Sequence, residues 1–443
     1  MRNLSLLSAL ALTTAASGFV ACSDDDASTA SGGSGAGNTN TTSTMGTGAN
    51  GGGSTGDECG DLNGPITESC TLTAAASPWL LQGVVTVEDG VVLTVEAGTT
   101  ITGEAASLGT LVVKRGARIE AAGTADNPIV FTSELPEGQR AAGDWGGLIL
   151  LGRAPITLSG GATEATIEGL TSDELYGGSD PMDNSGTLQY VRIEYSGVDL
   201  GDGDEINGLT FGAVGAGTTI DHVMVRNTLD DGFEWFGGTV NASHLIAYNA
   251  GDDYFDADQG YNGNLQFLFG ISNSPITGDP NGFEMDSIKD NDDASTDTAP
   301  TIWNVTLCGP TGGTNAGFGM VLREGFKGEI NNALVNGFDG GLSVRTETDE
   351  TNATDPTINN SIFFSTPLVD ADYAALSQST FDAGTGNLST DPGIPNCVGD
   401  TPEPIPATGT VGATPPAGFD TSADYVGAFS ASNDWATGAW VAY

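Results

Sequence analysis

A four-residue pattern recurs along this sequence and strongly limits what the chain can fold into. Each copy begins with an aliphatic residue and carries an aromatic residue, a histidine or an asparagine at its third position. The seven copies begin at Leu188, Ile220, Ala242, Leu265, Ile302, Ile330 and Ile358, in steps of 22 to 37 residues. Steps of 22 to 28 residues that hold short β-branched runs and glycine-rich turns are typical of one coil of a parallel β-helix. We interpret the longer steps as coils that carry loops.

The third position of this pattern predicts a stacked corner. Down the stack it reads Tyr190, His222, His244, Phe267, Asn304, Asn332 and Asn360. Asparagine suits a tight turn because it tolerates left-handed backbone torsions and its side chain can bond neighbouring backbone groups. We therefore expect an aromatic stack that continues as an asparagine ladder. This interpretation favours the two histidines as stacking residues over histidines that act in catalysis.

A second set of runs indicates another face of the same coils. These runs begin at Phe233, Phe255, Phe283, Phe318 and Leu342, and shorter ones begin at Val85, Val92, Leu111 and Ile129. Their alternation points the large apolar residues inward and the acidic neighbours outward.

The fold class follows from the two sets of runs. We predict an all-β protein with a single right-handed parallel β-helix over residues 58–443 that ends in a C-terminal cap. Polar insertions at 159–185 and 286–300 are expected to be loops on one flank. A β-sandwich or a propeller fits less well, because both need regularly spaced hairpin signals.

The N-terminus has the features of a secretory signal. Arg2 precedes an uncharged run that ends at Cys22. Residues 19–22 resemble the lipobox of bacterial lipoproteins, which implies that residues 1–21 are removed and that Cys22 carries the lipid. Residues 22–57 are rich in Gly, Ser, Thr and Asn and are expected to be a flexible tether. We expect a secreted chain with a membrane as its partner through this anchor, at the outer membrane or cell surface. The alternative is an ordinary signal with Cys22 as a free thiol.

The charge balance narrows the partners further. The chain has 58 acidic against 12 basic residues and a formal net charge of -46. Such a charge argues against nucleic acid as a partner, because phosphates would be repelled. A surface with this charge is suited to a salty environment, to binding divalent cations, or to both.

Four cysteines remain beyond Cys22, which is an even number for an oxidising compartment. Proximity favours Cys59 with Cys70 and Cys308 with Cys397, although three pairings are possible. With only 2 histidines and no CxxC motif, a zinc site has little support.

Several stretches resemble a known family. They are 116–133, the segment Gly143–Pro155, residues 231–238 and the closing residues 425–435. Together they are similar to a family of largely uncharacterised bacterial surface lipoproteins with a predicted β-helix, with a more distant likeness to β-helical polysaccharide lyases. The resemblance implies the fold and a surface location and implies no agreed activity.

The acidic face is the candidate site. One expected column contains Glu234, Asp256 and Glu284, a second contains Asp258 and Asp286, and the preceding turns contribute Asp252 and Asp253, with a further acidic pair at 230–231. Carboxylates about 5 Å apart repel by roughly 3 kcal/mol at an effective dielectric constant of 20. Such a face therefore needs hydration, shared protons, basic neighbours or a bound cation. Calcium is the expected cofactor, because it accepts six to eight oxygen ligands. A solvated acidic face without an ion is the alternative.

Three function classes remain. The first is a non-enzymatic surface module for adhesion or for binding an extracellular polysaccharide or a surface protein. The second is a calcium-assisted polysaccharide lyase, for which Arg323, Lys327 and Arg345 would be the candidate bases. The third is a glycoside hydrolase that uses two of the carboxylates. We favour the surface module, because acidic residues on repeated coils arise easily when the repeat is duplicated.

Overall fold

The computed structural model describes residues 57–170, 174–201, 204–273, 280–288, 296–310, 317–346, 352–399, 401–406 and 411–443. All of them belong to one compact unit, Ser54–Tyr443. The expected signal, the lipid site Cys22 and the tether up to residue 56 lie outside the described residues. Within the described ranges, the structure has no helix with the length and apolar character that a membrane span requires.

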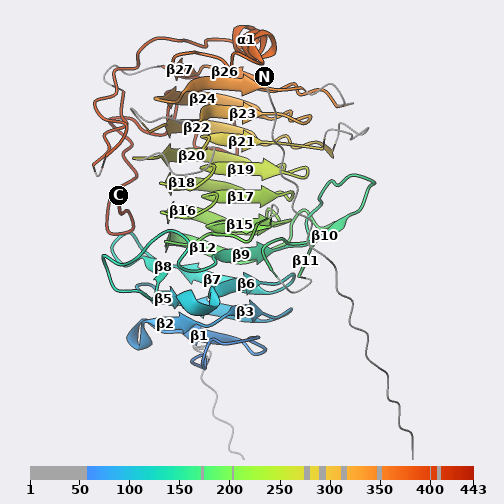
Figure 1. Cartoon of the computed structure of the whole chain (residues 1–443), viewed down its shortest axis with the longest axis vertical. Helices are drawn as coiled ribbons and strands as arrows, with labels where there is room; N and C mark the ends of the chain where they lie inside the picture. Colours follow the sequence, from blue (N-terminus) through green and yellow to red (C-terminus); the bar gives the residue numbers. More distant parts are fainter. Residues whose placement is uncertain are drawn as a thin grey trace, which may run out of the picture. The chain divides into compact units, whose positions relative to one another are not determined.

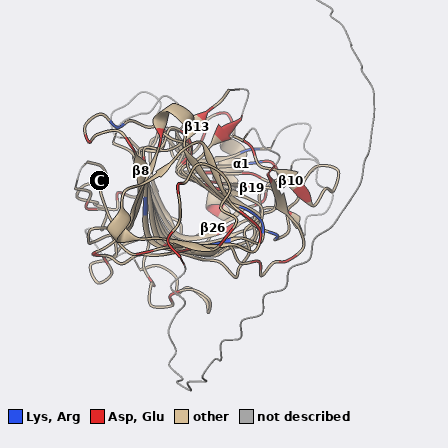
Figure 2. Ribbon diagram, turned by 90° about the horizontal axis from the view of Figure 1, so that it is seen from below, with Lys and Arg blue, Asp and Glu red and all other residues tan. Residues whose placement is uncertain are grey.

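Two long parallel sheets wind up the described residues coil by coil (Figure 1). The larger has 14 described strands: β1 (Cys70–Leu72), β2 (Trp79–Leu81), β4 (Val92–Val95), β5 (Thr100–Gly103), β7 (Arg118–Ala122), β8 (Ile129–Ser133), β12 (Gly186–Glu194), β16 (Thr219–Arg226), β18 (Ala242–Tyr248), β20 (Asn264–Ile271), β22 (Thr301–Cys308), β24 (Glu329–Asn336), β26 (Thr357–Asn359) and β27 (Ile362–Phe364). The smaller has nine: β3 (Val84–Val87), β6 (Thr110–Val113), β9 (Leu148–Leu151), β15 (Leu209–Gly212), β17 (Phe233–Phe236), β19 (Phe255–Asp258), β21 (Phe283–Met285), β23 (Phe318–Leu322) and β25 (Gly340–Val344). Seen along the stack, the strands of successive coils superpose (Figure 2). The predicted parallel β-helix is confirmed.

The interior of the coils is the main hydrophobic core. In β17, β19 and β21 the alternation places Phe233, Phe255 and Phe283 fully inside, as predicted. The rings of Phe233 and Phe255 stack with centroids 5.4 Å apart. The helix α1 (Ala374–Ala383) packs on the last coils, where Phe381 contacts Phe363 edge to face. Burial of one phenylalanine ring in each of three successive coils keeps the strands in register.

The predicted corner is also confirmed. Every residue of the column from Tyr190 to Asn360 has a left-handed φ between 49° and 61°. The strand ladder skips these residues: Gln189 pairs with Asp221, and the next pair is Val191 with Val223. The rings of Tyr190, His222, His244 and Phe267 stack with centroids 4.2 to 4.7 Å apart. One left-handed residue per coil therefore turns each long strand through the corner.

A second ladder was not predicted. Asn227 and Asn249 both have a left-handed φ, and the Asn249 amide donates a hydrogen bond to the Asn227 side-chain oxygen at 3.1 Å. The backbone N–H of Asn273 donates to the Asn249 side-chain oxygen at 2.8 Å. The signal was present, since asparagine recurs here after 22 residues, but it lay outside the four-residue pattern.

The C-terminal segment, residues 411–443, packs on the outside of the larger sheet. Outward-facing Met224, Ile246 and Phe269 form a second core with Phe429, Trp435 and Trp440. The ring of Trp435 meets His244 edge-on at 5.1 Å. This contact places the chain's end beside the middle coils (Figure 1).

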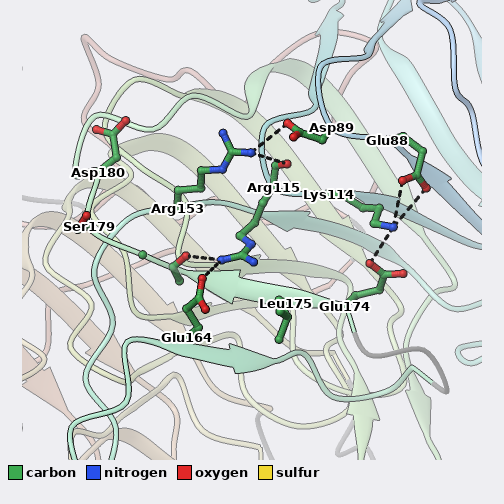
Figure 3. A pocket seen from close by; sticks show the side chains of 12 residues that line it. Glu88, Asp89, Lys114, Arg115, Arg153, Glu164, Glu174, Leu175, Ser179 and Asp180 are labelled. Atoms are coloured by element: carbon green, nitrogen blue, oxygen red, sulfur yellow. Dashed lines mark hydrogen bonds and ion pairs between the residues drawn. The ribbon is translucent and has the colours of Figure 1, made fainter.

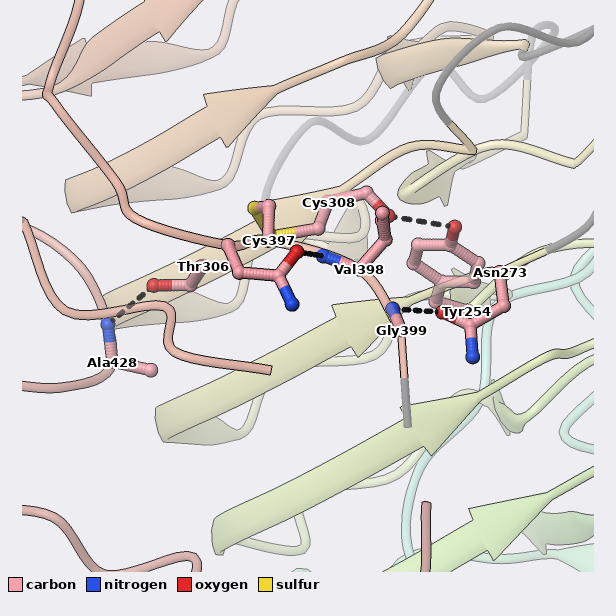
Figure 4. Close-up of a disulfide and its surroundings, with 9 residues drawn as sticks. Tyr254, Asn273, Thr306, Cys308, Cys397, Val398, Gly399 and Ala428 are labelled. Atoms are coloured by element: carbon pink, nitrogen blue, oxygen red, sulfur yellow. Dashed lines mark hydrogen bonds between the residues drawn. A yellow bond between two sulfur atoms is a disulfide. The ribbon is translucent and has the colours of Figure 1, made fainter. Parts of the chain in front are cut away.

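Two disulfides hold segments of the chain against the β-helix. Cys59 is bonded to Cys70, and Cys308 is bonded to Cys397, which are the two expected pairs. Around the second disulfide the Tyr254 hydroxyl donates to the Cys308 carbonyl at 3.1 Å (Figure 4). This disulfide connects β22 to the chain that leads into the C-terminal segment.

The insertion at 159–185 was expected to be a polar loop, and this expectation is wrong in part. It contains an antiparallel hairpin of β10 (Glu164–Thr166) and β11 (Leu175–Gly177). Buried Ile167 and Tyr176 pack with Ile156 and Phe236 in a third core on the outside of the smaller sheet. A second, shorter hairpin joins β13 (Val198–Asp199) to β14 (Glu205–Ile206). Tyr176 and the flanking isoleucines supply the apolar surface that holds the insertion in place. The insertion at 286–300 is described only at its two ends.

Replacing Asn332 with alanine is expected to destabilise the protein by about 2 to 4 kcal/mol. The fully buried side chain donates to the Ala413 carbonyl at 2.8 Å and accepts from the Ala413 N–H at 2.9 Å. Alanine loses both bonds and must still adopt the left-handed backbone. Denaturant unfolding measures the change. Asn360→Ala is the matched control: its backbone is equally left-handed, but its side chain makes no hydrogen bond within the described residues. Equal losses in the two variants would contradict the prediction.

Candidate functional site

Three carboxylates form the predicted column on the outer face of the smaller sheet. Glu234 on β17 pairs in register with Asp256 on β19, which pairs with Glu284 on β21. The register follows from the buried phenylalanine that precedes each acid. The arrangement of the column is therefore as predicted, and its role as a metal site stays a prediction.

The second predicted column is acidic on its first two coils and basic on the next two. Asp258 and Asp286 are followed on the next coils by Arg323 and Arg345, which the backbone bonds place in line. The Arg323 Nε donates to both oxygens of Asp286 at 2.8 and 2.9 Å, and its Nη2 bonds Glu284. Both oxygens of Asp286 are therefore already bonded to the Arg323 guanidinium, which makes Asp286 a poorer metal ligand than expected.

The turn acids have structural partners that the sequence did not reveal. The Asp231 side chain accepts the backbone N–H of Asp253 at 2.8 Å, and the Asp253 side chain accepts that of Asn281 at 2.6 Å. Each carboxylate thus receives a backbone donor from the next coil, as in an asparagine ladder.

Carboxylate oxygens converge at three places on this face. The groups are Asp230, Asp231 and Asp252; Asp231, Glu234 and Asp256; and Asp253, Asp256 and Glu284, with the oxygens of each group within 4.8 Å of one another. Asp231 and Asp256 are shared between neighbouring groups. One oxygen of Asp256 is buried and has no hydrogen-bond partner in the described part of the chain. Of the predicted ligands, Asp258 and Asp286 lie outside these groups. Asp230 and Asp231, which were not among the predicted ligands, belong to them.

Burial and repulsion between neighbouring carboxylates raise the pKa values of the acidic residues on this face. Burial first, and Glu234 and Glu284 next, raise the pKa of Asp256 well above its usual range. Burial and neighbouring acids raise the pKa of Asp230 to about 8 and that of Glu168 to about 7. Even beside Arg323, burial leaves the pKa of Asp286 raised to about 7. The acids therefore need either shared protons or a cation at neutral pH.

All three candidate bases of the lyase hypothesis are engaged. Burial alone would lower the pKa of Arg323, but Asp286 and Glu284 outweigh it and raise the pKa, which opposes a role in proton removal. Lys327 bonds Asp297, and Arg345 lies over the rings of Phe318 and Tyr373, 5.6 Å from each centroid.

A pocket of mixed charge lies beside the hairpin of β10 and β11 (Figure 3). It has a volume of about 680 Å³, and its lining includes three basic residues, Lys114, Arg115 and Arg153, among a larger number of acidic ones. Each has a carboxylate partner: Lys114 contacts Glu88 and Glu174 at 3.1 and 3.2 Å, Arg115 contacts Glu164, and Arg153 contacts Asp89 at 3.0 Å. This pocket was not predicted from the sequence, because its residues come from separate turns and an insertion.

The two histidines also converge on a carboxylate. His222 and His244 each place Nδ1 within 2.9 Å of Asp221. Burial would raise the pKa of Asp221, but the hydrogen bonds from both histidines outweigh it and hold the pKa well below its usual range. The imidazole rings stack 4.2 Å apart and within 18° of parallel, so both cannot point their lone pairs at one ion about 2 Å away. The stacked geometry favours a structural role.

Two parallel sheets joined coil by coil, with a charged outer face on the smaller sheet, define a parallel β-helix protein. The chain belongs to the pectate-lyase-like β-helix domain family, whose model matches residues 64–389. Among solved structures, the full-length tailspike protein 2 of Escherichia coli O157:H7 bacteriophage CAB120 shows a distant likeness. It has 12% sequence identity and a TM-score of 0.24, over 64% of this chain and 38% of the phage chain. No curated protein matches the chain in sequence.

Proposed function

We propose that the protein is a non-enzymatic polysaccharide-binding module of the cell surface, whose acidic face binds calcium and, through calcium, an anionic polysaccharide. The lipid expected on Cys22 would anchor it. The observation that carries the proposal is the position of Asp256. It is shared by two groups of converging carboxylates and has a buried oxygen without a hydrogen-bond partner in the described part of the chain.

Oxygen ligands of this kind favour hard cations. Calcium suits the face better than magnesium, because it accepts variable numbers of ligands and irregular geometry. A bound cation would replace the protons that the raised pKa values demand and would offset the repulsion between coils. It would also give a strongly acidic protein a local positive charge to which the carboxylates of a uronate polymer can bind.

Calorimetric titration with calcium chloride tests the ion site. We expect binding near 10⁻⁴ M, a typical order of magnitude for extracellular modules, and loss of at least tenfold in affinity in Asp256→Asn. The matched control is Asp126→Asn, which changes an exposed aspartate outside the groups of converging acids. Unchanged affinity in Asp256→Asn would contradict the site.

An array of uronate and neutral polymers tests the ligand. We expect retention of uronate polymers in calcium and release by a chelator. The same panel separates the enzymatic alternatives. Growth of absorbance near about 235 nm would indicate a lyase, and new reducing ends without that absorbance would indicate a hydrolase.

A further inference from the structure

Lys327, Asp297 and Asn352 form a compact trio on the flank of the late coils. The Lys327 Nζ bonds the Asp297 Oδ2 and lies 2.5 Å from the Asn352 Oδ1. The Asn352 Nδ2 donates to the other Asp297 oxygen, Oδ1, at 2.7 Å. One carboxylate therefore touches both the amine of the lysine and the amide nitrogen of the asparagine.

Two of the three side chains are buried, and separate backbone bonds fix the segments that carry the trio. The side chain of Asp297 is fully buried, and Asn352 is 5% exposed. The Lys327 N–H donates to the Thr298 carbonyl at 3.0 Å, and the Asp355 N–H donates to the Phe326 carbonyl at 3.0 Å. These bonds hold neighbours of all three residues on stacked segments. Fixed reacting groups in van der Waals contact favour an intramolecular reaction that would be slow between free molecules.

We propose that Lys327 and Asn352 become joined by an intramolecular amide bond, with Asp297 as the catalytic residue. The Lys327 ammonium first gives a proton to the Asp297 Oδ2. The neutral amine then attacks the Asn352 Cγ and forms the Nζ–Cγ bond. The Cγ–Nδ2 bond breaks, and protons held by Asp297 and Nζ pass to the leaving nitrogen. An ammonium ion departs, and Asp297 ends as a carboxylate.

The step balances without any co-reactant. A lysine ammonium and a primary amide become a secondary amide and an ammonium ion, so charge is conserved and nothing is oxidised or reduced. Asp297 can serve both transfers, because its two oxygens face the attacking and the leaving nitrogen. The new bond would close a covalent ring between the coil that contains Lys327 and the next one. It would also explain why this lysine is not free to act as a base.

Intact-mass measurement on the folded, secreted chain tests the proposal. We expect a mass about 17 Da below that calculated for the same processed and disulfide-bonded chain, the loss of one ammonia. After reduction, trypsin should leave peptide 324–345 uncut at Lys327 and joined to peptide 346–443, because an acylated lysine is not a cleavage site.

Lys327→Arg is the matched control. It keeps the positive charge beside Asp297 but has no primary amine, so the full mass should return. Asn–Gly pairs can also lose ammonia by cyclising, and that loss would persist in Lys327→Arg. Asp297→Asn should likewise show the full mass, with circular dichroism to check that it is folded. A wild-type chain of full mass, or a mass loss retained in Lys327→Arg, would overturn the proposal.

Discussion

At pH 8, Asp256→Asn is expected to stabilise the protein in chelator, and calcium is expected to reduce that advantage. Without a cation, Asp256 must either hold a proton or repel Glu234 and Glu284. A neutral amide relieves a repulsion of about 3 kcal/mol per close pair at an effective dielectric constant of 20. With calcium at about 100 times its dissociation constant, the wild-type protein gains about 2.7 kcal/mol that the variant largely loses. Thermal unfolding of both proteins in both buffers should show the difference in stability shrinking when calcium replaces the chelator, and an unchanged difference would contradict calcium binding at Asp256.

The same acids set the direction of the pH dependence. Folding raises the pKa of Asp230 to about 8 and that of Glu168 and Asp286 to about 7. A raised pKa in the folded state adds stability that is complete below the unfolded pKa of about 4 and disappears as the pH rises through 7 to 8. The chelated wild-type protein should therefore lose stability between pH 5 and pH 8, and calcium should restore it most at the upper end. A chelated protein that gains stability over this range would contradict the assigned burial of these acids.

Loss of the disulfide between Cys308 and Cys397 is expected to remove about 4.6 kcal/mol of stability, from the chain-entropy relation for a loop of 89 residues. The pair Cys308→Ser with Cys397→Ser should also loosen the C-terminal segment, because this disulfide holds the chain near the contact between Gly399 and Asn273. Denaturant unfolding measures the first effect. Limited proteolysis after residue 400 measures the second.

The other disulfide is the control. Cys59 and Cys70 close a loop of only 11 residues, for which the same relation predicts about 2.8 kcal/mol. Its removal should leave proteolysis of residues 411–443 unchanged. Equal protease sensitivity in the two double variants would show that the C-terminal segment is held by its aromatic contacts alone.

The sequence predicted the coil stack well, because a parallel β-helix repeats the same environment in every coil. The column from Tyr190 to Asn360 is recognisable from its spacing in the sequence, and each member has the expected left-handed backbone. Alternation likewise placed Glu234, Asp256 and Glu284 side by side. These are properties of short segments repeated at near-constant spacing, so local pattern was sufficient.

The composition of the acidic groups was less predictable. Asp286 lies in the predicted column, but Arg323 from the next coil engages it. Asp231 was seen as a turn acid, yet it belongs to two of the converging groups. Whether a carboxylate can coordinate a cation depends on its side-chain contacts with neighbouring coils. The repeated sequence pattern does not predict these contacts.

Residues alone determined the parallel coils, their register, the stacked corner and the acidic outer face, because each depends on periods of two residues or of one coil. Only the tertiary structure decided where loops and insertions meet. Three examples are the hairpin beside the pocket of mixed charge, the C-terminal segment against the histidines, and the contact of Asp297 with Asn352, 55 residues apart. The physical reason is that such contacts depend on the conformation of the loops and insertions between coils. These segments do not repeat from one coil to the next, so no sequence period predicts their conformation.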